Sequence, residues 1–409
     1  METTREIRGL AIAATTLLRP GRNGWTVPSQ NGGGAYRVDP DAGFCSCPDH
    51  ETRAVRCKHL LAVEFTLRRE RGKGGAYRVT EESVKVTYRQ EWSAYNRAQC
   101  EEKDRFVSLL SDLCATVPEP PPAPTGRPRI PLRDMSFATI YKVYSRFSSR
   151  RFTSDLRAAH QAGAIGNLPC FNSVTVYMRN PALTPVLKSL IVASSLPLKA
   201  IETDFAVDSS GFSTSRFVKW FNKKYGRETD NREWVKCHLM CGVNTNVVTS
   251  AEVSGWAAAD TNFFRPLLDT TAANFAIGEV SADKAYLSHA NATAVEAVGA
   301  SPYIPFKSNS LAVNPAEDSA WARMYHLFAY DRERFLTHYH KRSNVETVFS
   351  MVKGKFGDAV LSKSDVGQQN EVLAKVVAHN VCVLIGAIHE LGIDPRFGAG
   401  SALAQEVVA

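Results

Sequence analysis

The sequence contains no run of about 18 or more consecutive apolar residues, the length that a helix needs to cross a bilayer. We therefore predict no membrane-spanning segment. We also expect no secretion signal, because the nearest apolar stretch, Leu10 to Leu18, is short and follows Glu2 and Glu6. These absences predict a cytoplasmic protein, in which thiols stay reduced.

The sequence also lacks the paired cysteines of a disulfide scaffold. Three of the nine cysteines, Cys45, Cys47 and Cys57, lie close together beside His59. Clustered cysteines in a reducing compartment indicate a metal site. The other six lie in apolar or periodic contexts, and we predict that they are buried structural residues: Cys100, Cys114, Cys170, Cys237, Cys241 and Cys382.

Acidic residues are outnumbered: the sequence has 41 Asp and Glu residues and 49 Lys and Arg residues, which gives a net charge of +8. This balance favours a polyanionic partner, although a basic soluble enzyme fits it equally well. The apolar content of 44% and charged content of 22% are those of a globular protein. A chain of 409 residues predicts about two to four structural units.

The clustered cysteines follow the spacing Cys45-x-Cys47, nine residues, Cys57-x-His59. One pair on a β-turn and one pair entering a helix can complete a tetrahedron around Zn²⁺. Four protein ligands leave no open position, so this zinc would be structural. The alternative is three buried cysteines beside a chance histidine. His50, in the intervening loop, is a spare ligand that we expect to be solvated.

The motifs Cys-Ser-Cys-Pro at 45–48 and Cys-Lys-His at 57–59, followed by the helix-prone stretch from Leu60 to Val63, resemble the SWIM zinc finger. The resemblance implies a module that binds nucleic acid or protein.

Hydrophobic periodicity predicts short strands at 25–27 and 35–38, a helix after His59 and an amphipathic helix at 92–117. Seven prolines between 118 and 131 then predict an extended linker. Short helices with basic turns follow up to 198. Strands are predicted at 201–207, 234–243, 247–253, 275–282 and 303–306, and helices between the last two strands and at 333–354 and 371–391. This order favours an α/β core with a mixed sheet.

The predicted helix at 333–354 carries the pattern Tyr339-x2-Arg342-x3-Glu346-x6-Lys353. At about 100° per residue, these four positions fall within an arc of roughly 60°. An acid flanked by a phenol and two cations on one stripe is unusual for a helix face that is only solvated surface. The alternative is an ordinary surface helix with an i,i+4 Arg–Glu pair.

Two aspartates extend this pattern. Asp208 ends the alternating strand at 201–207 and begins the turn Ser209-Ser210-Gly211, and Asp283 ends the strand at 275–282. Phosphodiester cleavage needs such a carboxylate cluster to hold two divalent metal ions. Asp204 shares strand parity with Asp208 and is the alternative first acid. Asp260 is predicted to cap the helix that begins near residue 261.

Together these residues resemble the DDE transposases of prokaryotic insertion sequences, in the group with the Tyr-Arg-Glu-Lys signature, over residues 132–390. The resemblance implies a ribonuclease H-like fold in which Asp208, Asp283 and Glu346 are the catalytic acids and bind Mg²⁺ or Mn²⁺. Tyr339, Arg342 and Lys353 would contact phosphates and bases at the transposon end. The family often has glycine where Ala285 stands in this chain.

Five regions follow from these patterns: a zinc finger at 1–80, an amphipathic helix and linker at 81–131, a helical DNA-binding region at 132–198, a catalytic domain at 199–392 and a flexible tail at 393–409. The helical region is a candidate helix-turn-helix variant. Gly126-Arg127-Pro128-Arg129 resembles an AT-hook core, although a basic linker explains it as well. Further DNA-contact candidates, each of which a solvated charge or a sheet-surface position explains as well, are Arg150, Arg151, Arg157, Lys223, Lys224, Lys236, His238, Lys355 and Lys363.

The sequence therefore predicts a transposase that cuts double-stranded DNA at transposon ends and joins them to a target. It would act as a homodimer or higher oligomer on the prokaryotic nucleoid. Two alternatives stay open: a domesticated DNA-binding regulator without catalysis, and a metal nuclease that cleaves without strand transfer. The presence of all three expected acids favours the transposase.

Overall fold

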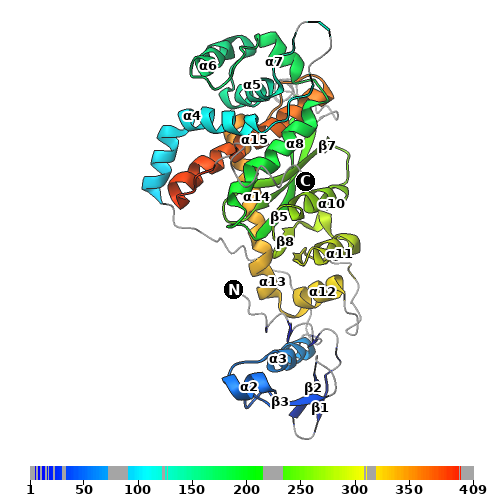
Figure 1. Cartoon of the computed structure of the whole chain (residues 1–409). Helices are drawn as coiled ribbons and strands as arrows, with labels where there is room; N and C mark the ends of the chain where they lie inside the picture. Colours follow the sequence, from blue (N-terminus) through cyan, green and yellow to red (C-terminus); the bar gives the residue numbers. More distant parts are fainter. Residues whose placement is uncertain are drawn as a thin grey trace. The chain divides into compact units, whose positions relative to one another are not determined.

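A computed structural model of the chain describes residues 5, 8–9, 12–13, 16, 18–21, 24–29, 34–71, 91–121, 125–126, 128–214, 234–307, 310, 319–395 and 397. The chain divides into two compact units, one formed by residues 1–85 and 281–341 and the other by residues 86–280 and 342–409. Figure 1 shows the elements in sequence colours.

The N-terminal part of the first unit is a small antiparallel sheet followed by two helices. Its strands, in spatial order, are β1 (Pro20–Gly21), β2 (Gly24–Pro28), β3 (Ala35–Asp39) and β4 (Phe44–Cys45). Helices α2 (Pro48–Arg53) and α3 (Lys58–Arg71) complete it. Val27, Val38 and Leu60 are buried between sheet and helix. The strands and the helix after His59 that the sequence predicted are confirmed.

The second part of this unit comprises η3 (Lys284–Tyr286), α11 (His289–Ala297), β9 (Ser301–Tyr303), α12 (Ala320–Tyr330) and α13 (Arg332–Tyr339). Helix α3 contacts α12, and the Arg334 guanidinium lies 5.6 Å from the centre of the Phe65 ring. The small sheet and its helix are therefore packed against a segment that lies far away in sequence.

The second unit contains most of the helices. They are α4 (Trp92–Ala115), α5 (Leu132–Ser145), α6 (Ser149–Gln161), α7 (Phe171–Tyr177), α8 (Leu183–Ser195), η2 (Leu196–Leu198), α10 (Thr261–Ala272), α14 (Ser343–Phe356) and α15 (Asp365–Leu391). Helix α15 contacts α4, α5, α8, α14 and strand β7. One apolar core therefore joins the helices before residue 198 to the sheet that follows, and the divisions predicted at 131 and 198 fall within it.

The main sheet has the strand order β7-β6-β5-β8-β9, with β5 (Asp204–Ser213), β6 (Trp234–Gly242), β7 (Val248–Gly255) and β8 (Glu279–Ala282). Strands β5, β6 and β7 are antiparallel, with Asp208 opposite Leu239. Alternation along β6 places Cys237 and Leu239 in the core shared with α8, α14 and α15, while His238 stacks on Phe263 of α10. The predicted α/β class is confirmed.

Two predicted element boundaries were wrong near the candidate site. Strand β5 continues through Ser209-Ser210-Gly211 to Ser213, so Asp208 lies in the middle of a strand and not before a turn. These turn-prone residues stay extended because they pair with Lys236, Cys237 and His238 of β6. A long-range ladder overrides the local preference of the Ser-Ser-Gly sequence.

The predicted helix at 333–354 is also interrupted. Helix α13 ends at Tyr339, the 3₁₀ turn η4 (His340–Arg342) follows, and α14 begins at Ser343. Residues three apart remain on one side in both helix types, so periodicity does not reveal such a break. Similarly, α15 begins at Asp365 and not near 371, because the hydroxyl of Ser364 caps its polar first turn by accepting from Gly367 N.

The prediction that the six scattered cysteines are buried holds for only three of them. Cys114, Cys237 and Cys241 are buried, Cys382 is half-buried, and Cys100 and Cys170 are exposed. Cys100 lies on the outer face of α4, and Cys170 immediately precedes α7. An apolar neighbourhood in sequence did not place their side chains in the core.

Among the described residues, α15 is the one helix whose length and mean hydropathy of 1.7 would allow it to cross a membrane, and 78% of its most apolar window is buried inside the protein. The same helix carries the buried polar residues Asn370, Lys375, His379 and Asn380. Each donates to or accepts from a partner elsewhere in the unit. These properties match the central helix of a folded core.

Asn380 completes the outer edge of β7. Its side-chain amide donates to Val248 O at 2.7 Å and to Ser194 Oγ at 3.0 Å, and its oxygen accepts from Val248 N at 2.9 Å. A side chain thus supplies the partners that a further strand would have given Val248.

We predict that Asn380→Ala lowers the free energy of unfolding by about 2–4 kcal/mol, because two buried backbone groups of Val248 lose their partners. Urea denaturation followed by circular dichroism measures this change. Asn262→Ala, at an exposed position of α10, is the control and should stay within about 0.5 kcal/mol of wild type. Equal stability of the two variants would contradict the assignment.

Candidate functional site

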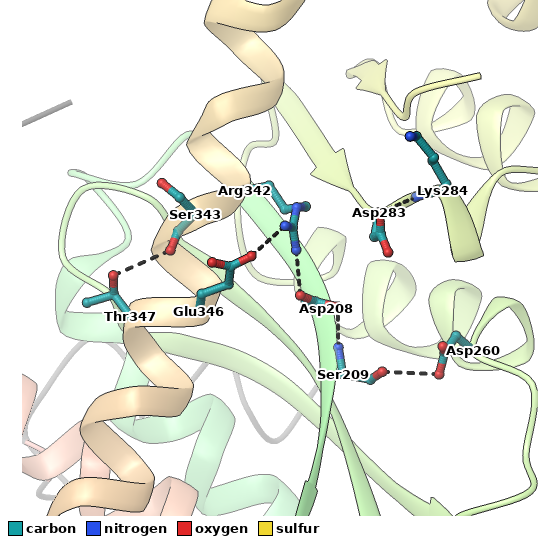
Figure 2. Close-up of polar contacts among 9 residues, drawn as sticks. All are labelled: Asp208, Ser209, Asp260, Asp283, Lys284, Arg342, Ser343, Glu346 and Thr347. Atoms are coloured by element: carbon teal, nitrogen blue, oxygen red, sulfur yellow. Dashed lines mark hydrogen bonds and ion pairs between the residues drawn. The ribbon is translucent and has the colours of Figure 1, made fainter. Parts of the chain in front are cut away.

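A single arginine connects two of the predicted catalytic acids. Arg342 Nη1 donates to Asp208 Oδ2 at 2.6 Å, and Arg342 Nη2 donates to Glu346 Oε1 at 2.5 Å. Figure 2 shows the guanidinium between the two carboxylates, one on strand β5 and the other on helix α14. The structure therefore brings together Asp208, Arg342 and Glu346, which lie up to 138 positions apart in sequence.

The packing of α14 explains this arrangement. Val345, Val348 and Val352 are buried in the core beneath the sheet. Alternation along β5 turns Asp208, Ser210 and Phe212 toward the same face. The polar edge of α14 therefore meets the polar positions of β5.

Lys353 makes a second contact between the same two elements. Its Nζ donates to Ser210 Oγ at 2.6 Å and lies 5.3 Å from the centre of the Phe212 ring. Sequence reasoning missed Ser210, which it placed in a turn. The sequence did contain a signal for it: Ser210 lies two positions after Asp208, and alternate residues of a strand point to the same face.

The two ion pairs of Arg342 differ in exposure. The side chains of Arg342 and Asp208 are each 19% exposed, whereas that of Glu346 is 57% exposed. An exposed i,i+4 pair contributes less than about 1 kcal/mol, so Asp208 is the firmer anchor for the guanidinium. Both carboxylates offer hard oxygen ligands of the kind that Mg²⁺ and Mn²⁺ prefer. The donor set fits a divalent cation.

Asp283 follows β8 directly, as the sequence predicted, and β8 lies next to β5 in the strand order. Its Oδ1 accepts from Lys284 N at 2.7 Å at the start of η3, a contact that Figure 2 shows. This hydrogen bond fixes one oxygen of the carboxylate at the end of the strand.

Asp204, the alternative first acid, stands at the start of β5, where its Oδ1 accepts from Thr203 Oγ1 at 3.3 Å. Four residues of extended strand separate it from Asp208 by about 13 Å. The ion pair with Arg342 distinguishes Asp208 from this competitor.

Helix α10 begins at Thr261 with Asp260 in the N-cap position, as predicted. The Asp260 side chain makes no cap hydrogen bond, and instead accepts from Ser209 Oγ at 3.1 Å and pairs with Lys236 Nζ at 2.5 Å. His238 is fully buried, and its Nε2 shares a hydrogen bond with Ser254 Oγ at 2.9 Å. Its side chain is therefore not accessible to DNA, although the sequence made it a candidate contact. Burial lowers the pKa of His238 to about 4. This cluster lies on the α10 face of β5, opposite Asp208.

The predicted DNA contacts are distributed over several elements. Arg150 and Arg151 are exposed in the first turn of α6, with the Arg150 guanidinium 5.5 Å from the Phe171 ring centre. Tyr339 ends α13, and Lys355 pairs with Glu102 inside the second unit. Arg127 of the AT-hook-like segment, together with Lys223 and Lys224, lies outside the described residues.

The four predicted zinc ligands converge. One ligand atom from each of Cys45, Cys47, Cys57 and His59 lies within 4.8 Å of the others, and all four residues are buried. Tetrahedral zinc with bonds of about 2.3 Å holds its ligands about 3.8 Å apart, so the cluster fits the ion. The spare candidate His50 is turned away, since its Nδ1 contacts Val55 O at 2.8 Å.

The electrostatics of the cluster also suit a cation. Hydrogen bonding from the Cys45 thiol lowers the pKa of Cys57 to about 3, helped by His59 and by the N–H of Leu60 at the start of α3. The pKa of Cys45 is raised in turn, first by that hydrogen bond and then by burial. His59 Nδ1 lies 3.9 Å from Cys45 Sγ. One thiolate is therefore already favoured where zinc would need it.

Comparison with known families supports both the site at Asp208 and Glu346 and the zinc-binding cluster. Residues 199–381 match the transposase DDE domain, and residues 36–67 match the SWIM zinc finger. The first match includes Asp208, Asp283 and Glu346, and the second includes all four cluster residues. No solved structure matches the chain.

We predict that Cys57→Ser releases zinc and unfolds residues from about 25 to 65, because a small metal-bound module loses folding free energy with its ion. Metal content by atomic absorption and limited proteolysis measure the two effects. Cys100→Ser, at an exposed position outside the cluster, is the matched control and should retain one zinc ion. Retained zinc in Cys57→Ser would reject the ligand assignment.

We also predict that Arg342→Gln tightens Mn²⁺ binding about fivefold, because the guanidinium competes for the Asp208 and Glu346 oxygens with a free energy of about 1 kcal/mol. Isothermal titration calorimetry measures this affinity. Lys353→Gln removes another cation of the same helix, whose Nζ donates to Ser210 Oγ, so it serves as the control. Equal Mn²⁺ affinities in both variants would show that Arg342 does not compete with the metal.

Proposed function

The chain carries a transposase DDE domain and a SWIM zinc finger, and we propose that it is a DNA transposase. It would bind transposon ends and catalyse DNA cleavage and strand transfer. The observation that carries the proposal is the pairing of Asp208 and Glu346 through Arg342. Two acids on separate elements share one cation at a position suited to an anionic, metal-assisted reaction.

The third acid of the proposal is Asp283. Its position directly after β8, the strand next to β5, supports this assignment together with the family resemblance. The proposed fold of the catalytic region is ribonuclease H-like. In such a fold, carboxylates from neighbouring strands and one packed helix act on a single phosphate.

The proposed chemistry has two steps. Water attacks the phosphorus at a transposon end, the P–O bond to the 3′ oxygen breaks, and that oxygen leaves with a proton as a 3′ hydroxyl. This hydroxyl then attacks a target phosphate and displaces a target 3′ oxygen. Bound Mg²⁺ or Mn²⁺ would supply Lewis-acid stabilisation of the oxygens that carry the developing charge.

The residues of the chain have separate roles in this proposal. Asp208, Asp283 and Glu346 hold the metal ions. Arg342, released from the two carboxylates it now pairs with, would turn its guanidinium to the phosphate, for which its planar fork is well suited. Lys353 and Tyr339 would contact the DNA near the cleaved bond.

Cutting both ends of an element requires at least two active sites, so the proposed active form on DNA is a homodimer or larger. The helices of 132–198 and the arginines Arg150 and Arg151 are proposed to contact DNA phosphates. We place the protein on the nucleoid in a prokaryotic cytoplasm, where its substrate lies.

We predict that Asp208→Asn, Asp283→Asn and Glu346→Gln each lower donor excision at least about 100-fold, because each removes one charged metal ligand without changing side-chain size. The assay places the DNA that flanks the gene around a marker and supplies each variant in trans. Asp269→Asn is the matched control, since this exposed carboxylate pairs with Arg265 on the outer face of α10. It should excise at the wild-type level.

The same assay separates the alternatives. Excision by all three acid variants would reject the catalytic assignment. Cleavage without reintegration of the marker would indicate a nuclease, and salt-sensitive binding to the flanks without cleavage would indicate a DNA-binding regulator.

A further inference from the structure

A basic cavity lies in the second unit, apart from the carboxylates of the candidate active site. Its volume is about 320 Å³, and it is lined by residues of α5, α7, α14 and α15, by the segment before α6 and by the loop after α14. Its charged residues are Lys142, Arg146, Arg179, Lys363, Lys375 and Glu371. Five cations therefore face one carboxylate.

The single carboxylate of the cavity already accepts hydrogen bonds from backbone N–H groups. Glu371 is 6% exposed and accepts from Leu361 N at 2.9 Å and from Ser362 N at 2.8 Å. It fixes the loop after α14, and its one negative charge is outnumbered by the five cations. The field in the cavity is thus that of the cations.

The cations fall into two groups. Three donate to backbone carbonyls: Lys375, which is 1% exposed, to Gly357 O and Ala359 O at 2.9 and 2.8 Å, Lys142 to Phe147 O, and Arg146 to Lys355 O at 3.4 Å. Burial lowers the pKa of Lys142, and the charge of Glu371 offsets this effect only in part. Arg179 and Lys363 line the cavity, are exposed and make no ion pair with the described residues.

Two neutral features add donors to the same cavity. Ser148 and Ser149 line it at the start of α6, where the N-cap residue Ser148 makes no side-chain cap hydrogen bond. The first N–H groups of this 13-residue helix are therefore left for another acceptor. The partial positive charge of a helix N-terminus reinforces the field of the cations.

The loop that forms one wall is attached to the strand that carries Asp208. Ser213 N donates to Asp358 O at 3.0 Å, and Val360 N donates to Ser213 O at 2.9 Å. Five residues of extended strand separate Asp208 from Ser213, a distance of about 17 Å. This corresponds to about five base pairs along a duplex.

We propose that this cavity binds the backbone phosphates of a DNA strand, at a distance of about half a helical turn from the cleaved bond. The identification of the ligand as DNA rests on the proposed function. The cavity itself selects for a phosphodiester, because several cations and backbone N–H groups converge on a space with no uncommitted acid. Its role is to position the duplex on the active-site strand.

The test compares Arg179→Ala/Lys363→Ala with Arg97→Ala/Arg265→Ala in the full-length, zinc-loaded protein. The control removes the same charge from exposed arginines of α4 and α10 that do not line the cavity. Fluorescence anisotropy with a flank duplex gives affinity as a function of salt, and thermal melting verifies folding. We expect the cavity variant to lower the slope of log K against log salt by about 0.9 for each phosphate that it no longer neutralises, and the control to leave it unchanged.

A second measurement uses duplexes with one neutral methylphosphonate at successive positions. Wild type should bind more weakly when the neutral group stands about five base pairs from the cleaved bond, and the cavity variant should be insensitive there. Unchanged slope and unchanged sensitivity in the cavity variant would overturn this proposal while leaving the transposase intact. Absence of any DNA binding by wild type would overturn both.

Discussion

Two carboxylates that approach each other repel unless a cation or a proton lies between them, and the candidate active site is built around this constraint. Asp208 projects from β5 and Glu346 from α14, and Arg342 donates to both. One end of the guanidinium is held at a largely buried carboxylate and the other at an exposed one. The shared guanidinium keeps the two carboxylates together without a metal ion.

The remainder of the second unit holds these two elements in place. Three valines of α14 enter a core that α15 dominates, and α15 in turn contacts helices from the N-terminal half of the chain. Asn380, Lys375 and Glu371 on α15 satisfy backbone groups of β7 and of the loop after α14. Polar side chains on an otherwise apolar helix thereby fix the loop and the strand edge that apolar packing alone would leave free to shift.

The zinc-binding cluster stabilises its surroundings by a different route. Its small sheet and α3 bury few apolar side chains, so a closed metal site supplies the folding free energy that such a core lacks. Helix α3 also packs against α12, and Phe65 against Arg334. The zinc finger is therefore part of a larger unit that includes residues 281–341.

The sequence by itself determined the zinc ligands, because Cys-x-Cys and Cys-x-His are local patterns whose members must stay close in any fold. The sequence also predicted the position of Asp283 after a strand, since the end of a strand can be recognised from neighbouring residues. Long-range packing, by contrast, keeps Ser209-Ser210-Gly211 extended, breaks the helix before Ser343, and pairs the Asp260 side chain with Lys236 and Ser209. The pairing of Asp208 with Arg342 joins residues 134 positions apart. Such contacts depend on strand register and helix packing across the whole unit, and no local pattern encodes them.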